Sequence, residues 1–124
     1  MNARIAHAPR RIEERMAEPL TVSKLAQEFH LSPSRFAHLF RAEFGVSPMR
    51  YLHIQRMLRA RTLLERTSLS VKEVMVQVGC SDPSHFARDF RRFHGLPPKE
   101  WRAALRGVHL EPSSEGLLLH SRGP

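Results

Sequence analysis

Two stretches of this sequence combine hydroxyl, imidazole and guanidinium side chains at helical spacing. The first set is Ser34, Arg35, His38 and Arg41, and the second is Ser84, His85, Arg88, Arg91 and Arg92. Residues three or four apart share one face of a helix, so each set would form one polar face. Arginine can donate two parallel hydrogen bonds to guanine or to phosphate, and serine or histidine can reach base edges. The chemistry that these residues suggest is contact with duplex DNA.

The arginines late in each set suit a different role from the groups that precede them. Arg41, Arg91 and Arg92 lie further along their helices, where we expect contacts with phosphates rather than with bases. Asp89 is an acid close to the second face, and three roles are open for it. It could pair with Arg92, accept from a cytosine amine, or face solvent.

Other reactive side chains do not combine into a catalytic or metal site. The eight histidines include no HExxH pair, and the sequence has one cysteine, so the ligand spacing of a zinc site is missing. Cys80 and His85 could act as nucleophile and base, but Cys80 falls in an expected turn, where a small buried residue is commoner. A second carboxylate and an oxyanion cradle are missing from the pattern. We therefore expect no enzyme activity, no metal ion and no cofactor.

Both polar faces belong to an internal repeat. A shift of fifty residues aligns identical residues at eight of sixteen positions, where unrelated stretches would give about one. In the first copy these are Pro33, Ser34, Phe36, Ala37, Phe40, Arg41, Gly45 and Pro48. Each copy has a short helix, a tight turn and a second helix that begins with a cap, Ser32 or Asp82, and a proline. This pattern is typical of a helix-turn-helix, whose second helix can lie in the major groove.

Apolar residues three or four apart, separated by turn signals, predict an all-α fold with seven helices. The expected helices are about Pro9–Met16, Val22–Phe29, Pro33–Phe44, Pro48–Arg66, Val71–Val78, Pro83–His94 and Pro98–Arg106. The inward stripes of the two polar helices are Phe36, Leu39, Phe40 and Phe44, and Phe86, Phe90 and Phe93. We expect these side chains to form the core, with about 1.5–3 kcal/mol from burial of each phenylalanine.

The expected organisation is two helix-turn-helix units joined by a long helix. The first unit covers residues 1–46, the linker helix 47–66, the second unit 67–106 and a flexible tail 107–124. A helix of nineteen residues at about 1.5 Å each is roughly 28 Å long, and successive major-groove faces recur about every 34–36 Å. The linker could therefore place both polar helices on one side of a duplex.

Composition also favours a polyanionic partner. The 124 residues suffice for one domain or two very small ones. Twenty Lys and Arg against twelve Asp and Glu give a net charge of +8 and a pI of about 11.2. All but three of the basic residues are arginines, which suit guanine and phosphate better than lysine does. A single cysteine, no long apolar run and no signal core predict a cytoplasmic protein without a membrane span.

The sequence from about residue 9 to residue 105 resembles the DNA-binding domain of the AraC/XylS family of bacterial transcription regulators. Its most specific matches are Gly79, Asp82, Ser84, Phe86, Arg88, Phe90, Gly95, Pro98 and Arg102. The resemblance implies a seven-helix module that binds an asymmetric promoter site as a monomer and often contacts RNA polymerase. By position, it implies that the base-reading residues are Ser34, Arg35, His38, Ser84, His85 and Arg88.

The expected function is sequence-specific binding of double-stranded DNA through two major-groove helices, which regulates bacterial transcription initiation. One alternative is a helical adaptor whose arginines pair with an acidic protein partner. A second alternative is binding to an anionic membrane surface. Such binding would need apolar residues on an exposed helix face, whereas the aromatic residues here lie on the inward faces. The sequence leaves open the target promoter, the direction of regulation, the effector, and whether the chain is a stand-alone regulator or a fragment.

Overall fold

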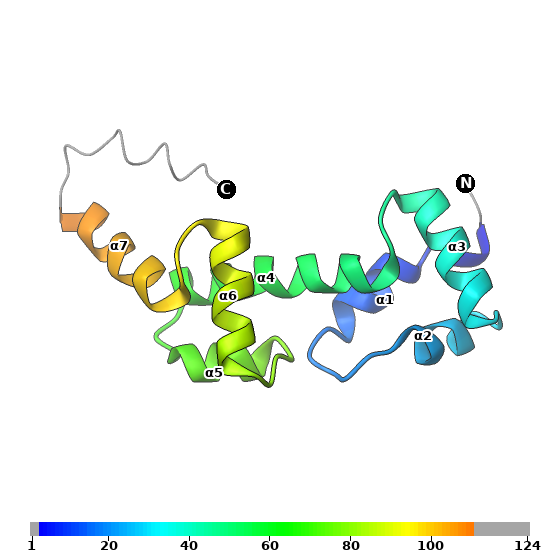
Figure 1. Cartoon of the computed structure of the whole chain (residues 1–124), viewed down its shortest axis with the longest axis horizontal. Coiled ribbons are helices and arrows are strands. Elements are labelled where there is room, and N and C mark those ends of the chain that lie inside the picture. Colours follow the sequence, from blue (N-terminus) through cyan, green and yellow to red (C-terminus); the bar gives the residue numbers. More distant parts are fainter. Residues whose placement is uncertain (1–2, 111–124) are drawn as a thin grey trace. The chain divides into compact units, whose positions relative to one another are not determined.

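The computed structural model describes residues 3–110, which form a short 3-10 turn and seven α-helices (Figure 1). The elements are η1 (Ala3–Ile5), α1 (Ala8–Glu14), α2 (Val22–Glu28), α3 (Pro33–Phe44), α4 (Pro48–Arg66), α5 (Val71–Gln77), α6 (Pro83–His94) and α7 (Pro98–Leu110). No strand occurs between residues 3 and 110, and the all-α prediction with seven helices is confirmed.

Helix boundaries differ from the expected ones at four helices, and the difference is largest at α7. It ends at Leu110 rather than Arg106, so residues 107–110, expected to begin a flexible tail, are helical. The rest of that expected tail lies outside the described residues. Near the N-terminus of the chain, α1 ends at Glu14 rather than at the expected Met16, because the chain turns after Glu14. The ends of α2 and α5 lie one residue earlier than expected.

The chain forms two compact units, Met1–Arg56 and Met57–Pro124, and the boundary falls inside α4. The sequence suggested that residues 47–66 form a separate linker segment, whereas the halves of α4 contribute to different cores. Leu52 belongs to the first core, and Met57 and Leu64 belong to the second. Each unit therefore has its own hydrophobic core.

The first core packs α2 and α3 around aromatic side chains. Phe36 and Phe40 on α3 are fully buried. The ring centroid of Phe40 lies 4.7 Å from that of Phe44 and 5.8 Å from that of Tyr51. The Tyr51 hydroxyl donates to the carboxylate of Glu13. Burial, reinforced by this acid, raises the pKa of Tyr51 to about 12.

The second core repeats this arrangement with two changes of residue type. A shift of fifty residues places His94 at the position of Phe44, and the Phe90 and His94 ring centroids lie 4.5 Å apart. Trp101 takes the place of Tyr51, with its centroid 6.1 Å from that of Phe90. An imidazole therefore stands in the second core where the first has a phenyl ring.

His94 is held in this core by a single hydrogen bond from its ring. It is 7% exposed, and its Nε2 lies 3.1 Å from the carbonyl oxygen of Met57. Its Nδ1 has no partner among the described residues. Burial lowers the pKa of His94, and the charge of Arg61 adds to this effect. The neutral ring that donates through Nε2 is therefore the form that fits the core.

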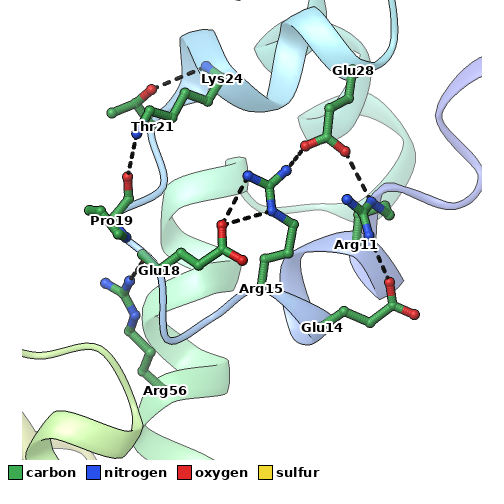
Figure 2. Close-up of polar contacts among 9 residues, drawn as sticks. All are labelled: Arg11, Glu14, Arg15, Glu18, Pro19, Thr21, Lys24, Glu28 and Arg56. Atoms are coloured by element: carbon green, nitrogen blue, oxygen red, sulfur yellow. Dashed lines mark hydrogen bonds and ion pairs between the residues drawn. The ribbon is translucent and has the colours of Figure 1, made fainter.

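Several arginines of the first unit form ion pairs within the fold (Figure 2). Arg11 and Arg15 both contact Glu28, across α1 and α2, and Arg15 also contacts Glu18 at 3.0 Å. Arg56 donates to the carbonyl oxygen of Glu18 at 2.8 Å. Surface pairs of this kind contribute about 0–1 kcal/mol each. Their main consequence is that these arginines serve the fold of the first unit.

In the second unit, Arg102 on α7 binds the end of α4 and the turn that follows it. Its guanidinium donates to the carbonyl oxygens of Leu64 at 3.2 Å, Thr67 at 3.1 Å and Leu69 at 2.5 Å. The last carbonyl groups of a helix have no partners within the helix itself. Arg102 therefore caps the end of α4 and fixes the turn that leads to α5.

Candidate nucleic-acid interface

The helices α3 and α6 begin with the caps that the sequence predicts. The hydroxyl of Ser32 accepts from the backbone N–H of Arg35 at 3.2 Å. Asp82 Oδ1 accepts from the backbone N–H groups of Ser84 at 3.0 Å and His85 at 3.2 Å. In both helices a proline follows the cap. The first turn of each helix, which carries several of the predicted base-reading groups, is therefore fixed by its own cap.

Both helices also end in the same way. Gly45 and Gly95 adopt left-handed conformations, with φ of +85° and +94°. Their N–H groups donate to the carbonyl oxygens of Arg41 and Arg91. A residue with a side chain adopts this conformation only at a cost, which glycine avoids. These ends give α3 and α6 the same length of twelve residues.

The inward and outward faces of α3 and α6 separate as expected. Phe36, Phe40, Phe86 and Phe90 are buried, whereas Leu39, Phe44 and Phe93, which were also expected in the core, are partly buried against it. All the predicted DNA-contacting side chains are exposed: Ser34, Arg35, His38, Arg41, Ser84, His85, Arg88, Arg91 and Arg92. At about 100° per residue, each set spans an arc of roughly 120° opposite its phenylalanine pair. Each unit thus presents one continuous polar face on its second helix.

On α6 the structure brings three of these arginines around one open hollow, which we call the arginine hollow. Arg88, Arg91, Arg92 and Gly95 line it, and its volume is about 330 Å³. The sequence assigned Arg88 to bases and the other two to phosphates, without a shared site. The signal that could have revealed it is their spacing, since residues three and four apart are neighbours on a helix.

Asp89 contacts a partner that the sequence interpretation did not consider. Its Oδ2 lies 3.7 Å from His85 Nε2, and its side chain is 13% exposed whereas that of His85 is 62% exposed. The two residues are four apart on α6, so their side chains share one face of the helix. Asp89 therefore stands beside a predicted base-reading side chain.

Two features bear on the other classes of function. Among residues 3–110, no group of three or more His, Cys, Asp or Glu side chains is placed to hold a metal ion. No helix of the described part of the chain is long and apolar enough to cross a bilayer. Cys80 lies between α5 and α6, in the expected turn, and is partly exposed.

Known proteins share this fold and much of this sequence. A family model described as a helix-turn-helix domain matches residues 25–104. A transcriptional regulator with an AraC-type DNA-binding domain, from Chromobacterium violaceum, has a similar structure. The TM-score is 0.73 and the identity 30%, over 82% of this chain and 90% of that one. The chain belongs to the AraC/XylS family.

Other members of the AraC/XylS family agree with this assignment. The DNA-binding domain of AdpA, solved in complex with a target DNA, matches with a TM-score of 0.79 and 32% identity, over 89% of this chain and 97% of that one. The arabinose operon regulatory protein of Salmonella typhimurium is 35% identical over 104 residues, which are 83% of this chain and 37% of that protein. The chain spans about a third of the length of the curated relatives that it matches.

These findings establish the general function of the chain. It is an AraC-type helix-turn-helix DNA-binding domain, and its family is one of transcription regulators. The predicted family, fold class and DNA-binding function are confirmed. The roles of individual side chains on α3 and α6 remain predictions.

Proposed function

We propose that this domain binds a specific sequence of double-stranded DNA with α3 and α6 in the major groove, and thereby regulates transcription initiation in a bacterium. The observation that carries the proposal is the duplicated outward face. Two capped helices of equal length each bury two phenylalanines and expose serine, histidine and arginine. A solvated surface with no partner gives no reason for the same face to occur twice.

Within each face, position along the helix assigns the roles. The residues near the helix start reach base edges: Ser34, Arg35, His38, Ser84, His85 and Arg88. In a helix-turn-helix the N-terminal residues of the second helix contact the bases. The later arginines, Arg41, Arg91 and Arg92, contact phosphates and hold the helix in register. The exposure of all these side chains supports the assignment.

We further propose that both units bind one duplex and that a single chain suffices. The 19-residue length of α4 supports this, since about 1.5 Å per residue gives roughly 28 Å, close to one helical turn of DNA. On this proposal the domain acts in the cytoplasm without catalysing a reaction, and RNA polymerase is its partner in regulation.

The first experiment is selection of bound duplexes from a random library, followed by binding measurements on the selected site. Arg88→Ala should cost about 1–3 kcal/mol on that site and relax the preference at one base pair. Arg41→Ala should weaken binding to all sequences alike and reduce the salt dependence by about one unit. Arg59→Ala is the matched control, because Arg59 is an exposed arginine on α4 and belongs to neither predicted face.

Two results would contradict the proposal. An unchanged base preference in Arg88→Ala would remove its base-reading role. Insertion of about five base pairs between the half-sites turns one of them to the opposite side of the duplex. Unchanged affinity for that duplex would show that the two units act independently.

The same measurements test the alternative of an adaptor for an acidic protein. Binding of duplex DNA with a preferred sequence and a steep salt dependence is not expected of such an adaptor. Selection that yields no preferred sequence would favour the adaptor instead.

A further inference from the structure

Asp89 is an acid at a position of α6 where the repeat has an apolar residue in its other copy. A shift of fifty residues aligns Asp89 with Leu39, which is partly buried against the first core. The side chain of Asp89 is only 13% exposed. Taking a carboxylate out of water costs free energy unless a partner compensates for the loss. Because the fold accepts leucine at this position, the acid needs a reason other than the fold.

The residue beside Asp89 also differs between the two units. His85 aligns with Arg35, so the second unit has both a different base-facing residue and a different residue behind it. Asp89 Oδ2 lies 3.7 Å from His85 Nε2. The leucine of the first unit has no polar atom that could make such a contact. The two changes together therefore create a polar contact that is specific to the second unit.

The burial of Asp89 limits what it can do by itself. With 13% of its side chain exposed, it offers little to solvent or to a cytosine amine in the groove. Pairing with Arg92 is compatible with the contact to His85, since a carboxylate has two oxygens that accept. His85 is 62% exposed and lies near the start of α6, where the second helix of a helix-turn-helix contacts bases. Asp89 can therefore act on a base through His85.

The effect on His85 follows from the chemistry of the imidazole ring. A neutral imidazole has one donor and one acceptor nitrogen, and the partner of one nitrogen decides which is which. A carboxylate only accepts, so Nε2 beside Asp89 is the donor and Nδ1 is the acceptor. The separation of 3.7 Å exceeds a hydrogen bond, and the exposed His85 side chain can shorten it by rotation. In the major groove, the donors that Nδ1 can meet are the amino groups of adenine and cytosine.

We infer that Asp89 is a positioning residue that orients the His85 imidazole, so that its Nδ1 accepts from the amino group of an adenine or a cytosine. The inference rests on the proposed function, because it requires α6 to lie in the major groove. It gives the second unit a readout that the first unit lacks at the aligned position. Arg35 there only donates, and its preferred partner is guanine.

The test uses the full chain and the duplex selected from a random library. His85→Ala identifies the base pair that His85 contacts. At this pair, purine replaces adenine, or 2-pyrimidinone replaces cytosine, so that only the amino group is removed. Wild-type binding should weaken about three- to tenfold, the usual worth of one neutral hydrogen bond, and binding by His85→Ala should change less than about twofold. Equal loss in both proteins, or a loss caused by a 7-deazapurine instead, would overturn the acceptor role of His85.

The role of Asp89 is tested by Asp89→Leu, which installs the residue of the first unit. This variant should respond to the missing amino group less than about twofold, like His85→Ala, and the double variant should respond no differently. Asp89→Asn should keep part of the response, because its amide oxygen still accepts. Glu100→Gln also removes one negative charge, from an exposed site on α7, and should respond like the wild type. A wild-type response in Asp89→Leu would refute the positioning role.

Stability and side-chain order give readouts that need no DNA. Leucine is a better helix former than aspartate, so Asp89→Leu should be at least as stable as the wild type by Trp101 fluorescence. A less stable variant would show that the fold requires the acid. Three-bond NMR couplings of His85 should report one χ1 rotamer in the wild type and averaged rotamers in Asp89→Leu. Averaged rotamers in the wild type would overturn the inference.

Failure of this inference is distinguishable from failure of the proposed function. A wild-type chain that selects no preferred duplex would refute the proposed function, and the base contact of His85 with it. A preferred duplex whose recognition is the same in the wild type, His85→Ala and Asp89→Leu would refute the inference alone.

Discussion

Replacing Arg102 by alanine should destabilise the second unit more than most surface substitutions do. Arg102 donates hydrogen bonds to the carbonyl oxygens of Leu64, Thr67 and Leu69, where α4 ends and the turn toward α5 begins. The variant loses all three bonds, and these carbonyl groups must then accept hydrogen bonds from water instead. The carbonyl groups of Leu64 and Leu69 are less able to do so than that of Thr67, because their bonds to Arg102 are part-buried.

The size of the effect follows from the kind of bond. A hydrogen bond from a charged donor contributes about 1.5–3 kcal/mol, so three such bonds set an upper limit of roughly 4.5–9 kcal/mol. The bond to Thr67 is exposed, and water can replace part of what is lost there. We therefore expect a loss of about 2–4 kcal/mol in the free energy of unfolding. Since about 1 kcal/mol shifts the midpoint of a small domain by roughly 4–8 °C, the thermal transition should fall by roughly 10–30 °C.

The chain contains a convenient reporter for this measurement. Trp101 is the only tryptophan and lies in the second unit, so its fluorescence during denaturation follows that unit. Arg102→Lys should recover part of the loss, because a lysine keeps the charge but lacks the fork that reaches several carbonyl groups. Arg59→Ala should stay within about 0.5 kcal/mol of the wild type. An Arg102→Ala variant as stable as Arg59→Ala would refute the capping role.

Three further predictions concern single residues of the two units. Because burial lowers the pKa of folded His94, the unfolded chain binds more protons, and stability should fall as the pH drops below about 6.5 toward the lowered value. His94→Phe places in the second core the residue that the first core has at Phe44. The loss of stability between pH 7.5 and pH 5 should then disappear from denaturation curves, and an unchanged pH dependence would show that His94 is not its source. Asp82→Ala should cost about 0.5–2 kcal/mol by Trp101 fluorescence, and Asp82→Asn much less, because asparagine also caps; equal losses would argue against the cap. Gly45→Ala should lower the free energy of unfolding by about 1–2 kcal/mol, because alanine is strained in the left-handed conformation of this residue. An added Cβ meets nothing within 4 Å, so the backbone is the only cause. An unchanged thermal transition would refute this prediction.

The parts of the fold that follow local rules were predictable from the sequence. Ser32 and Asp82 are good caps and each precedes a proline, so the starts of α3 and α6 follow from the first turn alone. The phenylalanines at helical spacing mark the inward faces, and the structure buries Phe36 and Phe90 completely. The outward faces then follow by elimination.

The details that depend on packing between helices were not predictable in this way. Arg56 and Arg102 bind backbone carbonyl groups that tertiary packing places within reach of their long side chains, and residue type and spacing alone do not indicate such partners. His94 aligns with a buried phenylalanine, yet histidine occurs both inside and outside proteins, so its burial could not be assigned. The contact of Asp89 with His85 was available from their spacing, but several basic side chains competed as partners.

The fixed starts of α3 and α6 have a consequence for how binding energy is used. Ordering a flexible residue costs about 1–2 kcal/mol of backbone entropy, and an interface made of loose loops incurs that cost whenever it docks. Here a cap and a proline hold the backbone of Ser34 and Ser84 in place before any duplex arrives. Such preorganisation leaves the discrimination between one duplex and another to the side chains alone.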